Sequence, residues 1–313
     1  MGESLSWPEI VSIREVGPRD GIQSEKADIS TADKIKLIDT LGDSGIPYIE
    51  AVSFVSPKAV PQMADALEVW NGIERKPKVF YSALVPNLRG AETAIEARVD
   101  GLQVFIAVTD SYNLKNVGKT VEDSLVDVAA VASAGEEAGI PVEGTISTAF
   151  GSPYEGDVDP STVVELSRRL MDMGISAISF GDTTGMATPR RVRDLVDELR
   201  TKLPELRLNM HFHDTRGTGL ANVLAALDLG VDYFDSSIGG MGGSPFAEGA
   251  TGNVATEDLV HMLTDMGIAT GIDFDRLIAA ARLAQSLVAG ELPSKTLKAG
   301  PRWETAGPVR EAG

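Results

Sequence analysis

Cysteine is missing from the 313-residue sequence, and histidine occurs only three times. Without cysteine the chain can form no disulfide, no thiolate zinc site and no thiol nucleophile, and this composition fits a reducing compartment. The first residues, MGESLSWPEI, lack the basic start and the long apolar core of a signal peptide. We therefore expect a cytoplasmic protein.

Positive charge is also in deficit. The 28 lysines and arginines face 46 aspartates and glutamates, which gives a formal net charge of −18. We expect no nucleic-acid partner, because phosphate binding needs clustered basic side chains, although a few local lysines would suffice for a small anionic ligand. Apolar runs such as 101–108 are too short to cross a bilayer, so we expect no membrane partner.

Short apolar, β-branched runs alternate with amphipathic segments along the whole chain. Eight runs are typical of strands: 11–16, 48–54, 78–85, 102–108, 142–150, 177–183, 208–214 and 233–239. Helical patterns lie between them, for example at 31–45 and at 161–174, where Asp159-Pro160 forms a start signal. The strands begin about 25 to 40 residues apart, which is the length of a βαβ unit.

Eight such units favour a (β/α)8 TIM barrel of the α/β class. A doubly wound open sheet is the alternative, but no GxGxxG pattern follows the first strand. No linker or composition break divides the chain, so we expect one domain. It would comprise a barrel over about 10–270, a short C-terminal helical extension over about 271–297 and a loose tail over 298–313.

Chemically capable side chains gather at the carboxyl ends of the predicted strands, which is where barrel enzymes carry their active sites. These positions are Arg19, Asp20, Glu50, Ser53, Ser179, Asp182, Thr183, His211, His213 and Asp214. His211 and His213 are two apart on one strand and therefore share a face. With Asp20 they indicate a site for a divalent metal, Mg²⁺ or Mn²⁺ first and Co²⁺ or Zn²⁺ as alternatives.

Two other residues have more ordinary interpretations. Arg19 keeps its proton and is suited to hold a developing oxyanion, and a salt bridge with Glu50 or Asp182 is the less favoured alternative. His261, on a helical stretch, is expected to be a surface or packing residue.

Long motifs in order along the chain resemble the HMG-CoA lyase family of metal-dependent barrels. They are EVGPRDGIQSEK, IEAVSFVSPKAVPQM, SFGDTTG, HFHDTRGTGLAN and GGMGGSPFAEGATGNVATEDLV, and they span roughly residues 10–297. The resemblance implies metal ligands at Asp20, His211, His213 and Asn253, with Glu50 as a supporting carboxylate. It implies that Gln23, Ser53, Ser179 and Thr183, with Asp182, line the substrate pocket, and that Lys26 and Lys115-Asn116 approach coenzyme A. It also suggests a homodimer.

The implied reaction is cleavage of a 3-hydroxy-3-methylglutaryl-CoA-type thioester to acetyl-CoA and a keto acid such as acetoacetate, a step of leucine degradation. Arg19 would stabilise the enolate of the leaving acyl-CoA. His211 is the candidate that moves the hydroxyl proton, with Asp20 as the alternative. Asp182 is a further acidic candidate.

Ser244 marks a departure from the family, which carries a cysteine at this point of the glycine-rich loop. A serine hydroxyl is a much weaker acid than a thiol, so direct proton donation by Ser244 would be poor. Three explanations remain open: a slow lyase of the usual specificity, a lyase for a longer 3-hydroxy-3-alkylglutaryl-CoA or for citramalyl-CoA, or a metal- and CoA-binding homologue with little turnover. The resemblance implies that this loop is a lid, which its glycines would allow to close over the acyl group, and a phosphate-binding loop is the alternative.

Two competing functions follow from the same pattern. Related barrels include aldolases for 4-hydroxy-2-oxo acids and synthases that condense acetyl-CoA with 2-oxo acids. A non-catalytic, metal-stabilised scaffold is the third possibility, but a scaffold has no need of the Arg19-Asp20 pair beside the two histidines.

Overall fold

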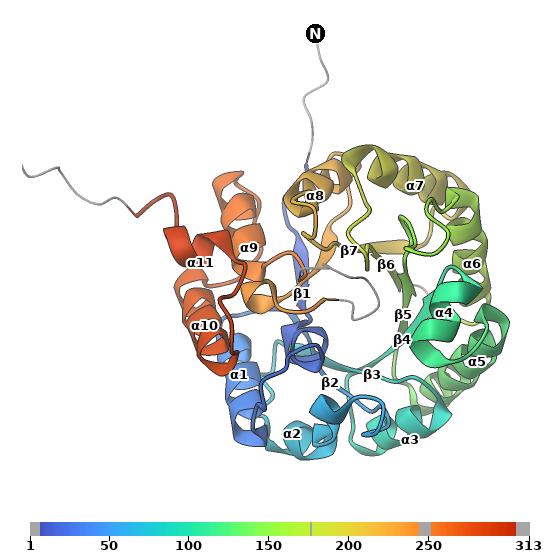
Figure 1. Cartoon of the computed structure of the whole chain (residues 1–313), viewed down its shortest axis with the longest axis horizontal. Helices are drawn as coiled ribbons and strands as arrows, with labels where there is room; N and C mark the ends of the chain where they lie inside the picture. The colour runs from blue at the N-terminus through green and yellow to red at the C-terminus, as the bar shows by residue number, and fades with distance from the viewer. Residues whose placement is uncertain (1–6, 176, 244–251, 305–313) are drawn as a thin grey trace, which may run out of the picture.

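Eight strands form a closed barrel in a computed structural model that describes residues 7–175, 177–243 and 252–304 (Figure 1). The strands are β1 Ser12–Glu15, β2 Tyr48–Ser53, β3 Phe80–Leu84, β4 Gly101–Ala107, β5 Val142–Ser147, β6 Ala177–Gly181, β7 Arg207–His211 and β8 Tyr233–Ser236. All neighbours pair in parallel, and β1 closes the ring by pairing with β8. The predicted TIM barrel is confirmed.

Helices cover the outside of this barrel. They are α1 Thr31–Asp43, α2 Ala66–Gly72, α3 Leu88–Glu96, α4 Asp110–Val117, α5 Val121–Ala138, α6 Pro160–Asp172, α7 Pro189–Lys202, α8 Gly219–Leu227, α9 Thr256–Asp265, α10 Phe274–Leu287 and α11 Lys295–Ala299, with short turns η1 Gly17–Gly21, η2 Pro61–Met63 and η3 Ile238–Gly240. The start signal at Asp159 is confirmed, because its carboxylate accepts the Ser161 backbone N–H at 2.9 Å and Pro160 opens α6.

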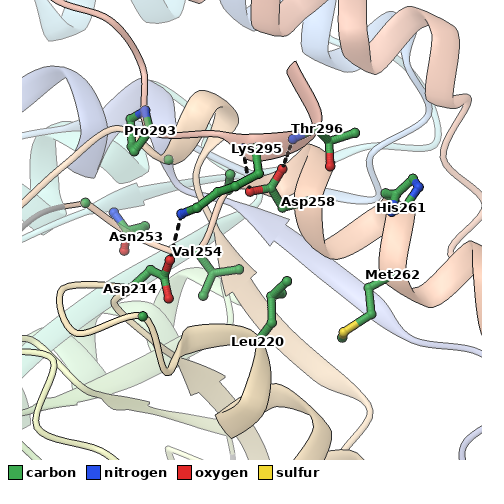
Figure 2. A pocket seen from close by; sticks show the side chains of 14 residues that line it. Asp214, Leu220, Asn253, Val254, Asp258, His261, Met262, Pro293, Lys295 and Thr296 are labelled. Atoms are coloured by element: carbon green, nitrogen blue, oxygen red, sulfur yellow. Dashed lines mark hydrogen bonds and ion pairs between the residues drawn. The ribbon is translucent and has the colours of Figure 1, made fainter. Parts of the chain in front are cut away.

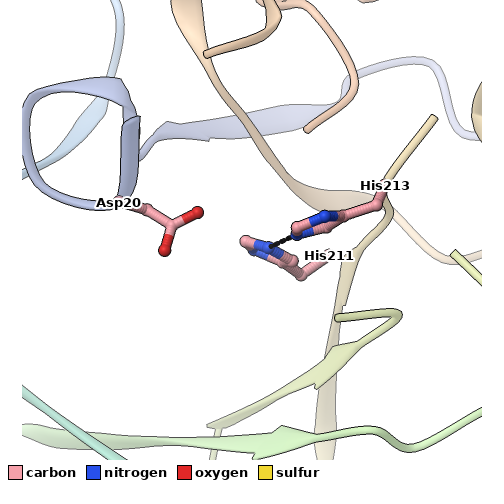
Figure 3. A group of neighbouring side chains, drawn as sticks. All are labelled: Asp20, His211 and His213. Carbon is pink, nitrogen blue, oxygen red and sulfur yellow. Dashed lines mark hydrogen bonds between the residues drawn. The ribbon is translucent and has the colours of Figure 1, made fainter. Parts of the chain in front are cut away.

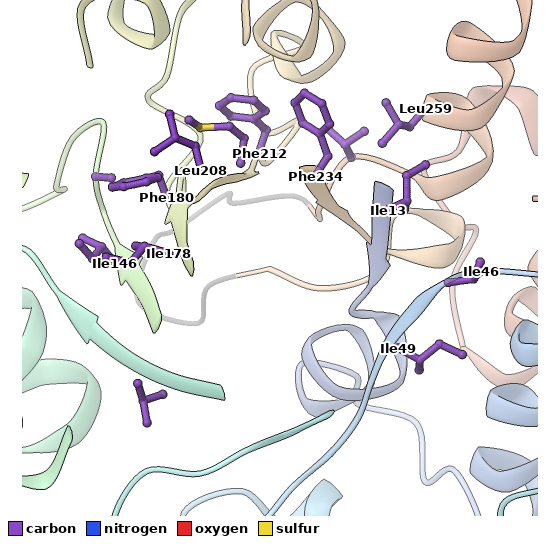
Figure 4. Packing of buried hydrophobic residues seen from close by; sticks show 14 of the residues in the cluster. Ile13, Ile46, Ile49, Ile146, Ile178, Phe180, Leu208, Phe212, Phe234 and Leu259 are labelled. Carbon is purple, nitrogen blue, oxygen red and sulfur yellow. The ribbon is translucent and has the colours of Figure 1, made fainter. Parts of the chain in front are cut away.

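Alternation along the strands separates an apolar outer face from a polar interior. Ile13, Ile178 and Phe234 belong to the hydrophobic layer between the barrel and its helices (Figure 4). The adjacent residues, such as Arg14 and Ser179, point the other way into the barrel and take part in buried hydrogen bonds. Many barrels fill this space with branched apolar side chains. Here the interior of the barrel is polar as far as its mouth, the end formed by the carboxyl ends of the strands.

The predicted strands extend beyond the observed carboxyl ends by one to three residues. After β6 and β7 the extra residues include the polar Asp182, Thr183 and His213, which lie beyond the ladder at the mouth, whereas after β1 to β4 each prediction is one apolar residue too long. Beyond β7, for example, His213 forms only an isolated bridge, with Asn253. At β6 and β7 the overlong predictions coincide with the candidate site.

The C-terminal helical extension is present as α10 and α11. In the described part of the predicted tail, Trp303 stacks on His261 with ring centroids 5.0 Å apart and Arg302 forms an ion pair with Asp265. His261 is thus a packing residue. Residues 305–313 lie outside the described part of the chain. Among the described residues, none of the helices combines the length and the apolar character needed to cross a membrane.

Candidate metal centre and active site

Asp20, His211 and His213 meet at the mouth of the barrel (Figure 3). One ligand atom from each lies within 4.8 Å of the others. The two histidines face each other through Nε2 atoms only 3.2 Å apart. Two nitrogens and a carboxylate at this spacing are a donor set that divalent metals accept.

The local backbone explains this convergence. His211 ends β7, and His213 bridges to Asn253, so both rings lie on one side of the barrel mouth. After β1 the chain winds into the π-turn η1, where the Val16 carbonyl accepts the backbone N–H groups of Arg19 and Asp20 at 3.1 and 2.7 Å. This turn carries Arg19 and Asp20 to the mouth.

Asp235 fixes the orientation of His211. Its Oδ2 lies 3.1 Å from His211 Nδ1, and because a carboxylate only accepts, Nδ1 carries the hydrogen. The neutral ring then presents the Nε2 lone pair toward His213. Burial alone lowers the pKa of His211, but the hydrogen bond to Asp235 and its negative charge outweigh this and raise the pKa.

Asp235 is itself held by a buried cluster that sequence reasoning missed. It accepts hydrogen bonds from Arg14 Nε and Nη2 at 2.8 and 2.9 Å, from Ser179 Oγ at 2.8 Å and from Asn209 Nδ2 at 2.7 Å. Burial favours its neutral form, yet the charge of Arg14 and the bond to His211 leave the Asp235 pKa far below its usual range. A charged residue inside each of two buried strands, Arg14 and Asp235, was the available signal. The two residues are register partners.

Arg19 is held in place by two carboxylates. Its Nε donates to Glu50, and its Nη1 donates to Asp20 Oδ1 at 2.9 Å. The salt bridge to Glu50 therefore exists, and Arg19 also remains at the mouth beside Asp20. Within the described residues Nη2 of Arg19 has no hydrogen-bond acceptor. That N–H group is available to an anionic oxygen of a substrate.

Asp20 is surrounded by positive or donating groups. Gln23 Nε2 lies 3.4 Å from Oδ1, and Asn253 Nδ2 donates to Oδ2 at 2.8 Å. Burial raises the Asp20 pKa, but Arg19 and the two histidines together lower it below the usual value. Asn253 Oδ1 is buried without a partner among the described residues.

The Asn253 side chain is packed against a glycine. A Cβ at Gly242 would lie 2.6 Å from Asn253 Nδ2 and 3.2 Å from Asp20 Oδ2, and its φ of +102° disfavours other residues. The amide of Asn253 also donates to the Met241 carbonyl at 2.9 Å. The turn after β8 thus determines where Asn253 sits.

Asp182 and Thr183 organise the loop after β6. Asp182 Oδ1 accepts the backbone N–H groups of Met186 and Ala187 at 2.7 and 2.8 Å, while Oδ2 is buried without a partner among the described residues. Burial raises the Asp182 pKa to about 7. Thr183 Oγ1 accepts the Thr148 N–H at 3.1 Å.

Some of the remaining predicted site residues are buried and others lie at the surface. Ser179 is buried against Asp235, and Ser53 is buried with no partner for its hydroxyl among the described residues. Lys26 is exposed, and Asn116 is half-buried on α4. Ser244 lies outside the described residues.

Glu15 is another buried carboxylate, and it connects two turns at the mouth. Glu15 Oε1 accepts the N–H groups of Gly17 and Ile238 at 2.7 and 2.8 Å, and Oε2 accepts Thr256 Oγ1 at 2.6 Å. It therefore joins η1 to the turn η3 after β8. Burial raises the Glu15 pKa to about 7.

Glu15→Gln is expected to flatten the pH dependence of stability between pH 4.5 and 7. The folded-state pKa of about 7 exceeds the ordinary value of 4.5, so this residue's contribution is complete below pH 4.5 and is lost as the pH rises to 7. At 1.36 kcal/mol per pKa unit the loss is about 3 kcal/mol. Urea unfolding with a chelator present would measure it. Glu9→Gln, at an exposed position, should keep the parental slope, and an unchanged slope in Glu15→Gln would refute the assignment.

Comparison with known proteins identifies the family of this chain. The family described as HMGL-like matches residues 10–284. The chain belongs to the HMGL-like family. As a member it is a carbon–carbon lyase, and the Asp20–His211–His213 group agrees with the metal dependence of the family.

Individual members of the HMGL-like family match over most of their length. The hydroxymethylglutaryl-CoA lyase of Bacillus subtilis is 43% identical over 94% of this chain and 98% of the relative. A Pseudomonas aeruginosa relative, named a 3-hydroxy-3-isohexenylglutaryl-CoA/hydroxymethylglutaryl-CoA lyase, is 44% identical with the same coverage. A solved HMG-CoA lyase from Acinetobacter baumannii, in complex with coenzyme A and 3-methylmalate, has a TM-score of 0.91 at 40% identity and covers 99% of this chain and 100% of its own.

Proposed function

We propose that this protein cleaves 3-hydroxy-3-methylglutaryl-CoA to acetyl-CoA and acetoacetate. The observation that carries the proposal is the meeting of Asp20, His211 and His213 beside Arg19 at the mouth of an HMGL-like barrel. A retro-aldol cleavage of this kind needs one group to take a hydroxyl proton and another to stabilise an enolate. Both kinds of group are present within this one cluster.

The donor set fits a divalent metal, with Mg²⁺ or Mn²⁺ as the preferred ions. Asp20, His211 and His213 would hold it, and the unpartnered Oδ1 of Asn253 makes that residue the fourth candidate. Glu50 would act indirectly, through Arg19. When bound, a divalent ion acts as a Lewis acid that makes a tertiary hydroxyl easier to deprotonate.

Asp20 is the better candidate for the base that takes the hydroxyl proton. Nδ1 of His211 donates to Asp235, so only Nε2 could ligate the metal, and once it did the ring would have no site left for a substrate proton. A carboxylate has two oxygens and about four lone-pair positions, so Asp20 can bind a cation and still accept a proton. We therefore assign His211 to ligation and Asp20 to proton transfer.

Arg19 would stabilise the negative charge that develops on the leaving group. Its Nε and Nη1 are held by Glu50 and Asp20, so the guanidinium is fixed before substrate arrives. As the O–H bond breaks, its electron pair forms the second C3–O bond of the new ketone. The C2–C3 bond breaks, and its electron pair moves to C2. The resulting acetyl-CoA enolate then takes one proton at C2.

The proposal is tested by measuring acetyl-CoA and acetoacetate released from the HMG thioester by the purified protein. We expect equal amounts of both products with Mg²⁺ or Mn²⁺ and none after removal of metal by chelation, with recovery when metal is added back. A panel containing a longer 3-hydroxy-3-alkylglutaryl-CoA and citramalyl-CoA determines the preferred acyl group. Pyruvate release from a 4-hydroxy-2-oxo acid, without acetyl-CoA from any thioester, would instead identify an aldolase.

The same assay includes Ser244→Cys, because Ser244 replaces the family's cysteine. A positioned acid typically contributes about 10²- to 10⁴-fold in rate, so the variant should turn over the HMG thioester faster than the parent. A loss of activity on another thioester of the panel would indicate that serine suits that substrate. A homodimer and a cytoplasmic location remain part of this proposal, together with coenzyme A contacts from Lys26 and Asn116.

A further inference from the structure

The segment Leu292–Thr296, which we call the C-terminal strap, lies against the turn that follows β8. The Ser294 N–H donates to the Gly239 carbonyl at 3.2 Å. A Cβ on Gly240 would lie 2.9 Å from Pro293 Cγ, so backbone and strap are in close contact there. This turn continues into Met241, whose carbonyl holds the Asn253 amide.

The strap is firmly anchored at its other end. Asp258 on α9 accepts the Ser294 hydroxyl at 3.1 Å and the backbone N–H groups of Lys295 and Thr296 at 3.0 and 2.6 Å. These hydrogen bonds fix the backbone of Lys295, and its side chain extends away from α9. Figure 2 shows this side chain extending across a cavity of about 450 Å³ to Asp214.

Asp214 is the contact that connects Lys295 to the metal centre. It directly follows His213, and its backbone N–H donates to the Gly252 carbonyl, at 3.1 Å, immediately before Asn253. Its Oδ1 accepts the Gly219 N–H at the start of α8, and its Oδ2 accepts Lys295 Nζ at 2.9 Å. One residue thus ties together the chain segments that carry two candidate ligands.

We propose that Lys295 is a positioning residue for the metal centre, acting through Asp214 on His213 and Asn253. This inference rests on the proposed function, since it presumes that these residues bind a divalent ion. Lys295 is 69% exposed, so an ordinary surface ion pair would add little to overall stability. Its effect should instead appear in metal affinity, as it does for groups that orient metal ligands in other proteins.

The experiment titrates Mn²⁺ into metal-free protein and measures the free ion by electron paramagnetic resonance. We expect Lys295→Met to weaken Mn²⁺ binding about 10-fold while the melting temperature of the metal-free protein falls by no more than about 3 °C. Lys295→Arg keeps the charge and should restore the affinity to within about threefold of the parent. Lys298 lies on α11 like Lys295 and pairs with Glu291, which precedes the helix; Lys298→Met breaks this pair and should bind as the parent does.

Parental affinity in Lys295→Met would overturn the inference and leave the proposed lyase intact. Equal weakening in Lys298→Met would overturn it too, because any loss of charge on α11 would then suffice. If neither the parent nor His211→Ala bound Mn²⁺, the metal centre of the proposed function would be refuted, and this inference would be refuted with it.

Discussion

Asp20→Asn is expected to lower kcat for the HMG thioester by about 10³-fold at saturating Mn²⁺. The amide keeps an acceptor oxygen for Gln23, but it cannot take the hydroxyl proton and no longer carries charge beside Arg19. Initial rates of acetyl-CoA release, measured across a series of Mn²⁺ concentrations, separate lost proton transfer from weakened metal binding.

Asp28→Asn provides the matched control, because Asp28 is exposed on the same stretch of chain. It should retain the parental kcat. If Asp20→Asn stayed within about 10-fold of the parent once metal is saturating, Asp20 would not be the base. His211 would then regain that role.

Asp235→Ala is expected to have the largest effect on stability. It removes the acceptor of five hydrogen bonds, two of them from the buried guanidinium of Arg14, which would keep only Glu143 as its charged partner. Breaking one partner of a buried ion pair costs about 3–5 kcal/mol. Thermal unfolding of the metal-free protein should therefore begin on the order of 10 °C lower.

Two comparisons complete this experiment. Asp232→Ala removes an exposed aspartate just before β8 and should melt within about 2 °C of the parent. Asp235→Asn preserves the shape of the side chain and should still weaken Mn²⁺ binding about 10- to 100-fold, because His211 loses the charge that orients it. A parental melting temperature for Asp235→Ala would contradict the assigned role of the buried cluster.

The barrel could be predicted from the sequence because its signals are local and repeated. Each apolar run falls on an observed strand, and capping residues such as Asp159 start their helices where expected. The error at the ends of β6 and β7 came from treating polar residues such as His213 as part of the ladder. Whether a residue stays paired there depends on neighbours that arrive from distant parts of the chain, such as Asn253.

The sequence pointed to the residues of the candidate site but not to the hydrogen bonds that hold them in place. The HxH spacing pointed to His211 and His213, and family resemblance supplied Asn253. The cluster around Asp235 was missed, because the charged residues Arg14 and Asp235 within two apolar strands indicate a buried pair only once these strands are known to be neighbours. Only the register of β8 against β1 shows that Arg14 and Asp235 face each other.

The pairing of β8 with β1 has a consequence for folding. Asp20 follows the first strand, His211 ends the seventh and His213 lies just beyond it, so the three ligand atoms come together only when the last strand has closed the ring. A nascent chain that stops before β8 contains Asp20, His211 and His213 in its sequence but lacks the geometry to hold an ion. A divalent metal would therefore favour the finished barrel alone, by about 2.7 kcal/mol when its concentration is one hundred times its dissociation constant. Metal availability would then influence how much of the newly made protein survives, as well as how fast it works.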